Sequence, residues 1–396
     1  MINNLSFRKP IIEPENSKIN ADIWPIVQTY YEKGDYANTV RSCINYIDSS
    51  IEKKYANADC TSYKIPHGST YINIEITEEV FEVTAPFLNI DTAKKVPVLR
   101  QVSQLNFSPL TITNIELIDG QLYFKFSCKL NECEPYKIYD VLKEICINAD
   151  NYDDEFIHKF GAKHIQAPNI IPYSAEQKEA AWNLVQLYIK EALQGYEQLE
   201  DKRLANYLFD ILIITLLKID YCCAPQGNLR VQLEKTISKL TSTDDYYQRM
   251  NSGKEFLLKL QAYNKETLGE SLYSIDIFVP YKNRSTLENI RNTLKYAYET
   301  SEKEIKAEDY LGAIFTLQHH ILYLLYNNTV ELAITQLFVN AMIDASEKPV
   351  KEAASILFSA VQKLMNSDNF EVPNNDISST KTEDGFFQKI FKMVKW

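Results

Sequence analysis

The residues of this sequence that could carry chemistry begin with a cluster of carboxylates. Asp150, Asp153, Asp154 and Glu155 lie within one predicted helix, and paired carboxylates perform acid–base catalysis where a cleft separates their pKa values. Helical spacing places these four side chains opposite the apolar stripe of the same helix. We therefore expect a solvated acidic face rather than a catalytic pair.

The cysteines and histidines do not have the spacing of a metal site. Cys128 and Cys133 are close in sequence, but a structural zinc site uses four ligands, commonly two Cys-x-x-Cys pairs or paired histidines. His319 and His320 are neighbours on a predicted helix, where adjacent side chains point about 100° apart. We expect core thiols and ordinary histidines, with no metal and no cofactor.

Motifs of common enzyme classes are also missing from the sequence. It contains no Gly-x-Ser-x-Gly elbow, Walker loop, dinucleotide-binding fingerprint or His-Glu-x-x-His sequence. Its 10 glycines argue against a Gly-rich phosphate loop. We expect no catalytic residues, and an enzyme with its site in a helical domain is only the third hypothesis.

Composition and charge restrict the class of protein further. With 396 residues, 45% hydrophobic and 24% charged, the chain is expected to be globular, with two domains. A net charge of −11 disfavours a nucleic-acid partner, which requires clustered Lys and Arg. The frequent Tyr, Asn, Ile and Lys are typical of an AT-rich bacterial genome.

Localisation is predicted from the termini, the apolar runs and the cysteines. The first 14 residues lack the apolar core of a signal peptide. The most apolar run, residues 211–217, has seven residues, whereas a membrane span needs about 20. An odd number of cysteines, seven, suits reduced thiols. We expect a cytoplasmic protein.

Hydrophobic periodicity predicts an α+β domain over residues 20–165, after an N-terminal extension of residues 1–19. A helical start bends at Gly34-Asp35, and alternation then predicts two strands joined by a polar turn at residues 77–79. Next comes a helix with Pro97 in its first turn.

The second half of this domain is predicted from a turn and a long stripe. Asp119-Gly120 between alternating strands predicts a two-residue hairpin turn, because these residues tolerate positive φ. The closing helix is predicted from apolar residues recurring at helical spacing from Ile138 to Phe160. The order is therefore helix, two strands, helix, two strands, helix.

This order and three stretches of sequence resemble the YbjN-like family, whose fold is shared with class I type III secretion chaperones. The stretches are Val96-Pro97-Val98-Leu99-Arg100-Gln101-Val102 with Leu105-Asn106, the Asp119-Gly120 hairpin, and Asn148-Ala149-Asp150-Asn151-Tyr152-Asp153 followed by Phe156. The resemblance implies an antiparallel sheet with helices on one face, often paired as a dimer, that binds an extended segment of a protein client. It covers roughly residues 20–165 and implies no catalytic residues.

An all-α domain is predicted over residues 174–366, after a boundary that contains Pro168 and Pro172. Ser174 and Gln177 have the spacing of a capping box. Two similar stretches, residues 31–36 and 305–310, look like turns between the paired helices of a tetratricopeptide repeat, but two copies do not establish a solenoid. Seven further helices are expected, at about 203–222, 228–240, 244–263, 284–305, 309–327, 329–345 and 350–366.

The end of the sequence carries the strongest binding signal. Residues 367–384 are polar and rich in breakers, which predicts a flexible linker. Residues 385–396 predict an amphipathic helix with Lys389, Lys392 and Lys395 toward one side. It could dock on its own body, bind a partner's groove or lie in a membrane interface. The predicted partner-binding residues are Phe386, Phe387, Ile390, Phe391, Val394 and Trp396.

These observations favour a non-enzymatic adaptor or chaperone. It would hold a protein client through the α+β domain and use the tail as a second contact, and a homodimer is compatible with the family resemblance. The alternative is a membrane-peripheral scaffold that the tail anchors. No nucleic acid is expected as a partner.

Overall fold

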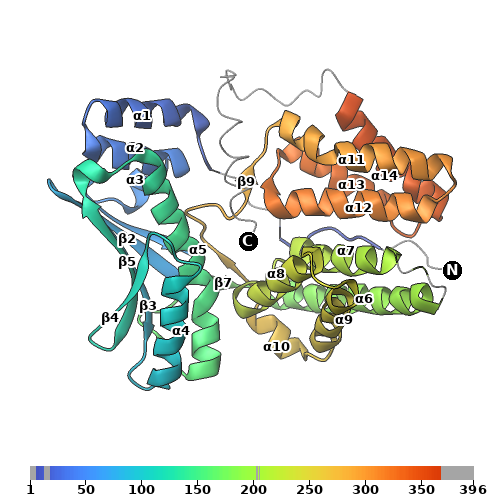
Figure 1. Cartoon of the computed structure of the whole chain (residues 1–396), viewed down its shortest axis with the longest axis horizontal. Helices are drawn as coiled ribbons and strands as arrows, with labels where there is room; N and C mark the ends of the chain where they lie inside the picture. The colour runs from blue at the N-terminus through green and yellow to red at the C-terminus, as the bar shows by residue number, and fades with distance from the viewer. Residues whose placement is uncertain (1–5, 13–17, 202–203, 205, 367–396) are drawn as a thin grey trace. The chain divides into compact units, whose positions relative to one another are not determined.

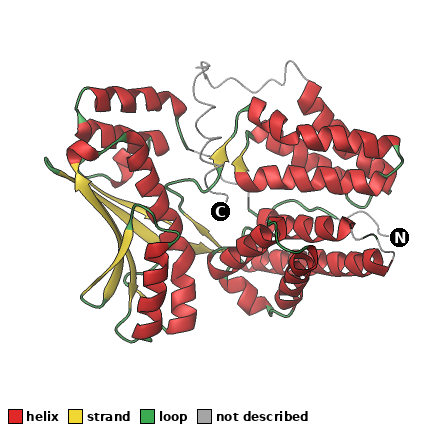
Figure 2. Cartoon of the chain, in the orientation of Figure 1, coloured by secondary structure: helices red, strands yellow, loops and turns green. Residues whose placement is uncertain are grey.

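The computed structural model describes residues 6–12, 18–201, 204 and 206–366, and Figure 1 shows their helices and strands. Met1–Asn366 form one compact unit, and residues 367–396 lie outside the described residues. An antiparallel sheet with helices comes first, and a largely helical region follows it (Figure 2). The α+β and all-α classes predicted from the sequence are therefore confirmed.

The chain enters the α+β region through short helices. They are a 3-10 turn at Ala21–Ile23, α1 (Trp24–Glu32), α2 (Tyr36–Ile47) and α3 (Ile51–Tyr55). The predicted bend between the first two α-helices is confirmed. Gly34 has a φ of +74°, which a residue with a side chain rarely adopts, and Asp35 accepts a hydrogen bond from the Asn38 amide at 3.3 Å to begin α2.

The sheet has three strands before the helix that follows Asn89, whereas the sequence predicted two. Its strands are β1 (Ser62–His67), β2 (Thr70–Ile76), β3 (Val80–Asn89), β4 (Asn114–Ile118) and β5 (Gln121–Lys129), in the antiparallel order β1-β2-β3-β5-β4. A short β6 (Lys163–His164) pairs with β3. The predicted pair of strands with its turn at residues 77–79 is confirmed as β2 and β3, and the prediction was wrong only in missing β1.

Register places one face of the sheet in the core. Ile74 pairs with Val83, which pairs with Phe126, and these three side chains point inward. Asn73 and Lys125, one position along their strands, are partly exposed on the other face. The predicted turn at Asp119-Gly120 is confirmed, since both residues have positive φ, of 47° and 77°.

Helices cover the inner face of this sheet. After β3 the chain forms α4 (Lys95–Phe107), and after β5 it forms a 3-10 turn (Leu130–Glu132) and the long α5 (Pro135–Phe160). Contacts join α5 to β2, β3 and β5, and α4 to both α5 and β4. The sheet, α2, α4 and α5 thus share one hydrophobic core.

The second region consists mainly of helices. The capping box at its start is confirmed, because the Ser174 amide donates to Gln177 Oε1 at 2.8 Å and the Gln177 amide donates to Ser174 Oγ at 3.2 Å. Its elements are β7 (Ile170–Pro172), α6 (Ala175–Asp201), α7 (Asn206–Cys223), α8 (Gly227–Thr241), α9 (Tyr246–Gln261), α10 (Lys265–Glu270), β8 (Tyr273–Ile275), β9 (Asn283–Arg284), α11 (Leu287–Lys306), α12 (Tyr310–Asn327), β10 (Asn328–Thr329), α13 (Leu332–Ala345) and α14 (Val350–Asn366).

A short segment of the helical region packs into the core of the α+β region. Phe278 and Val279, which follow β8, are buried in the core of the α+β region. Close to them, the Gly68 amide donates to the Asp276 carbonyl at 2.9 Å. The expected boundary near residue 168 is therefore crossed by contacts.

The apolar run at residues 211–217 lies inside α7, where all of its apolar side chains are buried. None of the helices in the described part of the chain combines the length and the apolar composition that a membrane crossing needs.

Candidate protein-binding surface

Exposed apolar side chains gather on α4, on β4 and on the loop that joins them. Among the described residues, 14 large apolar side chains are exposed, and six of these lie between residues 96 and 118. Phe107 is 90% exposed and Val96 is 71% exposed. We call this group the α4–β4 surface; its members are Val96, Leu99, Phe107, Ile112, Leu117 and Ile118.

The two elements of the α4–β4 surface lie next to each other at the edge of the sheet (Figure 1). On α4, the residues Val98, Val102 and Leu105 face the core. Helical spacing turns Val96 away from that buried stripe and places Leu99 at its edge. Exposure of these side chains therefore follows from a helix that is apolar on more than its core-facing side.

The Asn106 side chain takes the place of a neighbouring strand along β4. Its Nδ2 donates to the Ile115 carbonyl at 3.0 Å, and its Oδ1 accepts from the Ile115 amide at 2.7 Å. An edge strand presents such groups to any chain that can pair with it. Asn106 thus satisfies one residue of the edge and ties α4 to β4.

A carboxylate on α5 holds the loop between α4 and β4. The hydroxyl groups and amides of Thr111 and Thr113, and the Ile112 amide, all donate to Glu144, at distances from 2.6 to 3.1 Å. Burial alone would raise the pKa of Glu144, but these hydrogen bonds outweigh it and hold the pKa below its ordinary value. Ile112 is therefore presented to solvent from a loop with fixed geometry.

Charges of both signs border the surface, and the positive ones lie along α4. Residues 94–115 contain Lys94, Lys95 and Arg100 and no Asp or Glu, whereas the whole chain has a net charge of −11. Lys95 Nζ lies 3.9 Å from Asp91 Oδ1, just outside this stretch. Glu116 and Asp119, which flank Leu117 and Ile118, are acidic. The margin of the surface is therefore basic along α4 and acidic along β4, and its α4 side suits an apolar segment that has acidic neighbours.

The acidic cluster singled out in the sequence is not a solvated face, and that prediction was wrong. Asp150 is 4% exposed and Asp153 is 3% exposed. Both lie on α5, which packs against α8 of the helical region as well as against the sheet. The face of α5 that periodicity predicted to be exposed is covered by α8. The sequence of α5 alone does not show this.

Asp150 ends a buried chain of hydrogen bonds that sequence reasoning missed. The Phe278 amide donates to His67 Nδ1 at 3.0 Å, and His67 Nε2 lies 3.1 Å from the Tyr281 hydroxyl. That hydroxyl donates to Asp150 Oδ2 at 2.9 Å. Because Nδ1 accepts, the ring is neutral with its proton on Nε2. Burial lowers the pKa of His67 to about 4.

The surroundings of this chain of hydrogen bonds suit structure rather than catalysis. Arg230 lies over the Tyr281 ring at 4.0 Å, and Ser69 Oγ donates to Asp153. Burial, and then the neighbouring carboxylates, raise the pKa of Asp153 well above its ordinary value. The cavity beside Ser69, Asp153 and His164 has a volume of about 10 Å³. Such a space holds about one water molecule and no larger substrate.

The other residues considered for chemistry have ordinary surroundings. Cys128 Sγ and Cys133 Sγ lie 3.7 Å apart as free thiols. Burial lowers the pKa of His319 to about 3, and that of His320 below its ordinary value. Within the described residues, no group of three or more His, Cys, Asp or Glu side chains could hold a metal ion.

The predicted partner-binding residues of the tail, from Phe386 to Trp396, lie outside the described residues. The α4–β4 surface was not singled out from the sequence, although its signal was present. That signal is the acid-free stretch with surplus apolar residues on α4.

No protein-family model matches the chain, and a search of curated proteins gives no significant match.

Proposed function

We propose that this chain is a non-enzymatic, cytoplasmic adaptor or chaperone that holds a protein client on the α4–β4 surface of its α+β region. The observation that carries the proposal is the concentration of six exposed apolar side chains on two adjacent elements. Concentrations of exposed apolar side chains on soluble proteins often mark interaction sites. The family resemblance noted in the sequence leads to the same class of function.

The fixed geometry of the surface supports binding. Asn106 and Glu144 hold β4 and the loop before it through side-chain hydrogen bonds. A preformed surface loses less conformational entropy when a partner binds. The client segment that fits is apolar, with acidic residues that approach Lys94 and Arg100.

A membrane-peripheral scaffold is the second candidate. The sequence predicted the tail as its anchor, and the basic α4 side of the surface would also attract anionic lipid. Three cations, at Lys94, Lys95 and Arg100, are few for stable membrane attachment, since each contributes about 1 kcal/mol. Protein binding is therefore the better supported of the two.

The experiment is site-specific crosslinking from this surface. A photoreactive amino acid at Phe107 should crosslink a defined client in cells, and the change Val96→Asp should abolish that crosslink without changing the melting temperature. Leu332→Asp is the matched control, because Leu332 is 56% exposed on α13, away from the surface. Loss of the crosslink with Leu332→Asp as well would show that the contact is nonspecific.

Lipid binding is tested with the same variants. Co-sedimentation with vesicles that contain anionic phospholipid should be weak and unchanged by Val96→Asp. Strong co-sedimentation that Val96→Asp removes, without any protein crosslink at Phe107, would reject the adaptor in favour of the scaffold.

A further inference from the structure

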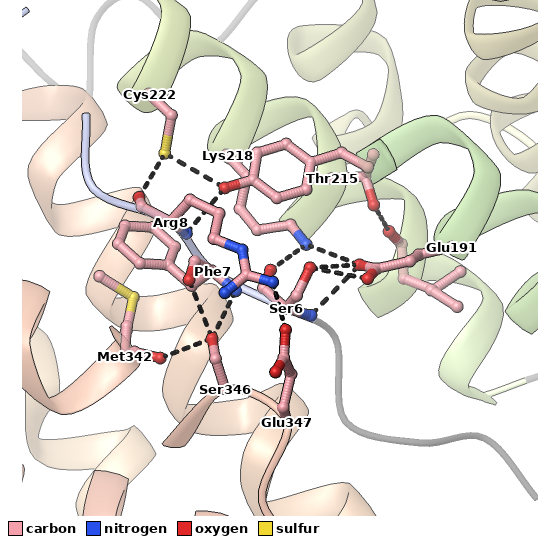
Figure 3. A network of polar contacts seen from close by, with 12 residues as sticks. Ser6, Phe7, Arg8, Glu191, Thr215, Lys218, Cys222, Met342, Ser346 and Glu347 are labelled. Carbon is pink, nitrogen blue, oxygen red and sulfur yellow. Dashed lines mark hydrogen bonds and ion pairs between the residues drawn. The ribbon is translucent and has the colours of Figure 1, made fainter. Parts of the chain in front are cut away.

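Residues 6–8 lie across the helical region as an extended segment, in contact with α6, α7 and the end of α13 (Figure 3). From the sequence, this segment was predicted only to belong to an N-terminal extension. Ser6 is 3% exposed and Phe7 is 1% exposed. The segment therefore fills a groove that side chains of three helices line.

Helix side chains bind the main chain of this segment. The Ser6 carbonyl accepts from Lys218 Nζ at 2.8 Å, and the Ser6 amide donates to Glu191 at 3.2 Å. The Phe7 amide donates to Ser346 Oγ at 2.6 Å, and that hydroxyl donates back to the Phe7 carbonyl at 2.9 Å. These contacts recognise an extended backbone without regard to its side chains.

The next residue continues the pattern. The Arg8 amide donates to the Tyr188 hydroxyl at 3.0 Å, and Cys222 Sγ donates to the Arg8 carbonyl at 3.4 Å. Three consecutive residues thus have their amides and carbonyls bound by side chains of the helices. In most folds this role belongs to neighbouring backbone.

Three side chains of the segment add selectivity, and the first is Ser6, whose Oγ donates to Glu191 Oε1 at 2.7 Å. Phe7 is buried beside the ring of Tyr221, with 6.3 Å between ring centroids. The Arg8 guanidinium pairs with Glu347 at the surface. Phe7 and Arg8 together define one deep aromatic site and one acidic site at its exit, which are the features of a peptide-recognition groove.

The groove is costly to leave empty. Lys218 is fully buried over the Tyr188 ring, 4.2 Å from its centroid, and its closest carboxylate is Glu191 at 3.9 Å. Burial lowers the pKa of Lys218 to about 8. A buried cation needs hydrogen-bond partners, and the Ser6 carbonyl supplies one. Replacing the occupant of the groove by another segment therefore costs less free energy than leaving the groove empty.

We propose that this groove is a second binding site, for an extended segment of a partner protein in which an aromatic residue precedes an arginine or lysine. In this proposal Ser6–Phe7–Arg8 is the resident ligand, and the partner's segment replaces it by making the same contacts. The site is independent of the α4–β4 surface, because none of its contacts involves α4 or β4.

The test uses a fluorescent peptide with the sequence of residues 3–12 and the full-length protein. The change Phe7→Ala in the protein removes the anchor of the resident segment and keeps the groove. We expect this variant to bind the peptide at least about ten-fold more tightly than the wild type, because the resident segment competes less. A variant that stays folded by circular dichroism and shows no binding at about 1 mM peptide would overturn the proposal.

A charge exchange tests whether the peptide binds in the proposed register. In the Phe7→Ala background, Glu347→Arg should reverse the preference, so that a peptide with Arg8→Glu binds about five-fold more tightly than the unmodified peptide. The factor is modest because the pair is exposed. An unchanged preference would place the peptide elsewhere and overturn the proposal.

If Phe7→Ala prevents folding, Arg8→Glu in the full-length protein decides the matter. This change leaves the Phe7 anchor in place and weakens the resident segment only at the surface. It should increase binding of the unmodified peptide a few-fold over the wild type. No increase would mean that residues 6–8 are a permanent part of the fold.

Discussion

At the scale of single residues, His67 shows how a neutral buried group ties distant parts of the chain together. Its two ring nitrogens contact Phe278 and Tyr281, which lie more than 200 residues away in sequence. Protonation of Nδ1 would direct a second proton at the Phe278 amide. The ring must therefore stay neutral for these contacts to persist.

Acid should accordingly destabilise the protein through His67. Unfolded His67 takes up a proton near pH 6.5, and folded His67 does so only near pH 4. Between these values the unfolded state binds more protons, so the free energy of unfolding falls as pH falls, by up to about 3 kcal/mol. Urea unfolding at pH 7.0, 5.5 and 4.5 should show a flatter dependence on pH for His67→Gln than for the wild type.

The control for this experiment is the exposed residue His158. His158→Gln should keep the wild-type dependence on pH. Equal slopes for wild type and His67→Gln would show that the histidine does not couple folding to pH. The raised pKa of Asp153 works in the opposite direction, because a carboxyl group that protonates more readily when folded gains stability as pH falls. The difference between variants in the pH dependence of the free energy of unfolding is therefore more informative than the slope of any one variant.

At the scale of elements, Asn106 joins α4 to β4 by acting as a strand neighbour. Asn106→Ala leaves the Ile115 amide and carbonyl with water as their only replacement partner. We expect the free energy of unfolding to fall by about 1 kcal/mol, which is typical of an exposed hydrogen-bonded pair. Hydrogen exchange at the Ile115 amide should become faster, and chemical denaturation should report the loss of stability.

The neighbouring residue Gln104 provides a matched control for Asn106. It is exposed on the same helix, and Gln104→Ala should change neither quantity. If Asn106→Ala leaves exchange at Ile115 unchanged, β4 is held by β5 alone. The α4–β4 surface would then be less rigid than the proposed function assumes.

Local patterns in the sequence predicted most elements, and the exceptions have physical causes. The strand β1 was missed because Pro66 and His67 interrupt its alternation, and both are buried in the structure. Proline is acceptable there because β1 is an edge strand, where one row of amides needs no partner. The polar residue His67 is acceptable because its partners come from the helical region.

The candidate surface was only partly predictable for a related reason. Periodicity predicted that Val98, Leu99, Val102 and Leu105 form the buried face of α4, but Leu99 is 39% exposed. It assigned no meaning to apolar residues outside that face, such as Val96 and Phe107. Their exposure depends on which elements pack on α4. That information comes from tertiary contacts, and these contacts also bury Asp150 and Asp153 against expectation.

At the scale of the whole molecule, two short segments cross between regions that are separate in sequence. Residues 6–8, near the N-terminus, fill a groove among α6, α7 and α13. Phe278, from the helical region, is buried in the α+β core. Neither segment has a helical or strand period of its own. A sequence divided by periodicity alone therefore yields two domains, whereas Met1–Asn366 form one compact unit.

Because Phe278 connects the two regions, a substitution at Phe278 should destabilise both of them. Phe278 is 2% exposed, and Phe278→Ala should lower the free energy of unfolding by about 3–5 kcal/mol, the usual effect of removing a buried phenyl ring. Trp24 in α1 and Trp182 in α6 report on the two regions separately when each is the single tryptophan left in the chain. Both reporters should show unfolding at the same lower denaturant concentration.

Tyr296→Ala serves as the control, since Tyr296 is 64% exposed on α11 and its removal should move neither transition. A shift of the Trp24 transition without the Trp182 transition would contradict the prediction. In that case the segment around Phe278 would stabilise only the α+β region, and the two regions would unfold as independent units. Joint movement would instead mean that a client bound to the α4–β4 surface stabilises the helical region as well, because binding to one part of a cooperative unit stabilises all of it.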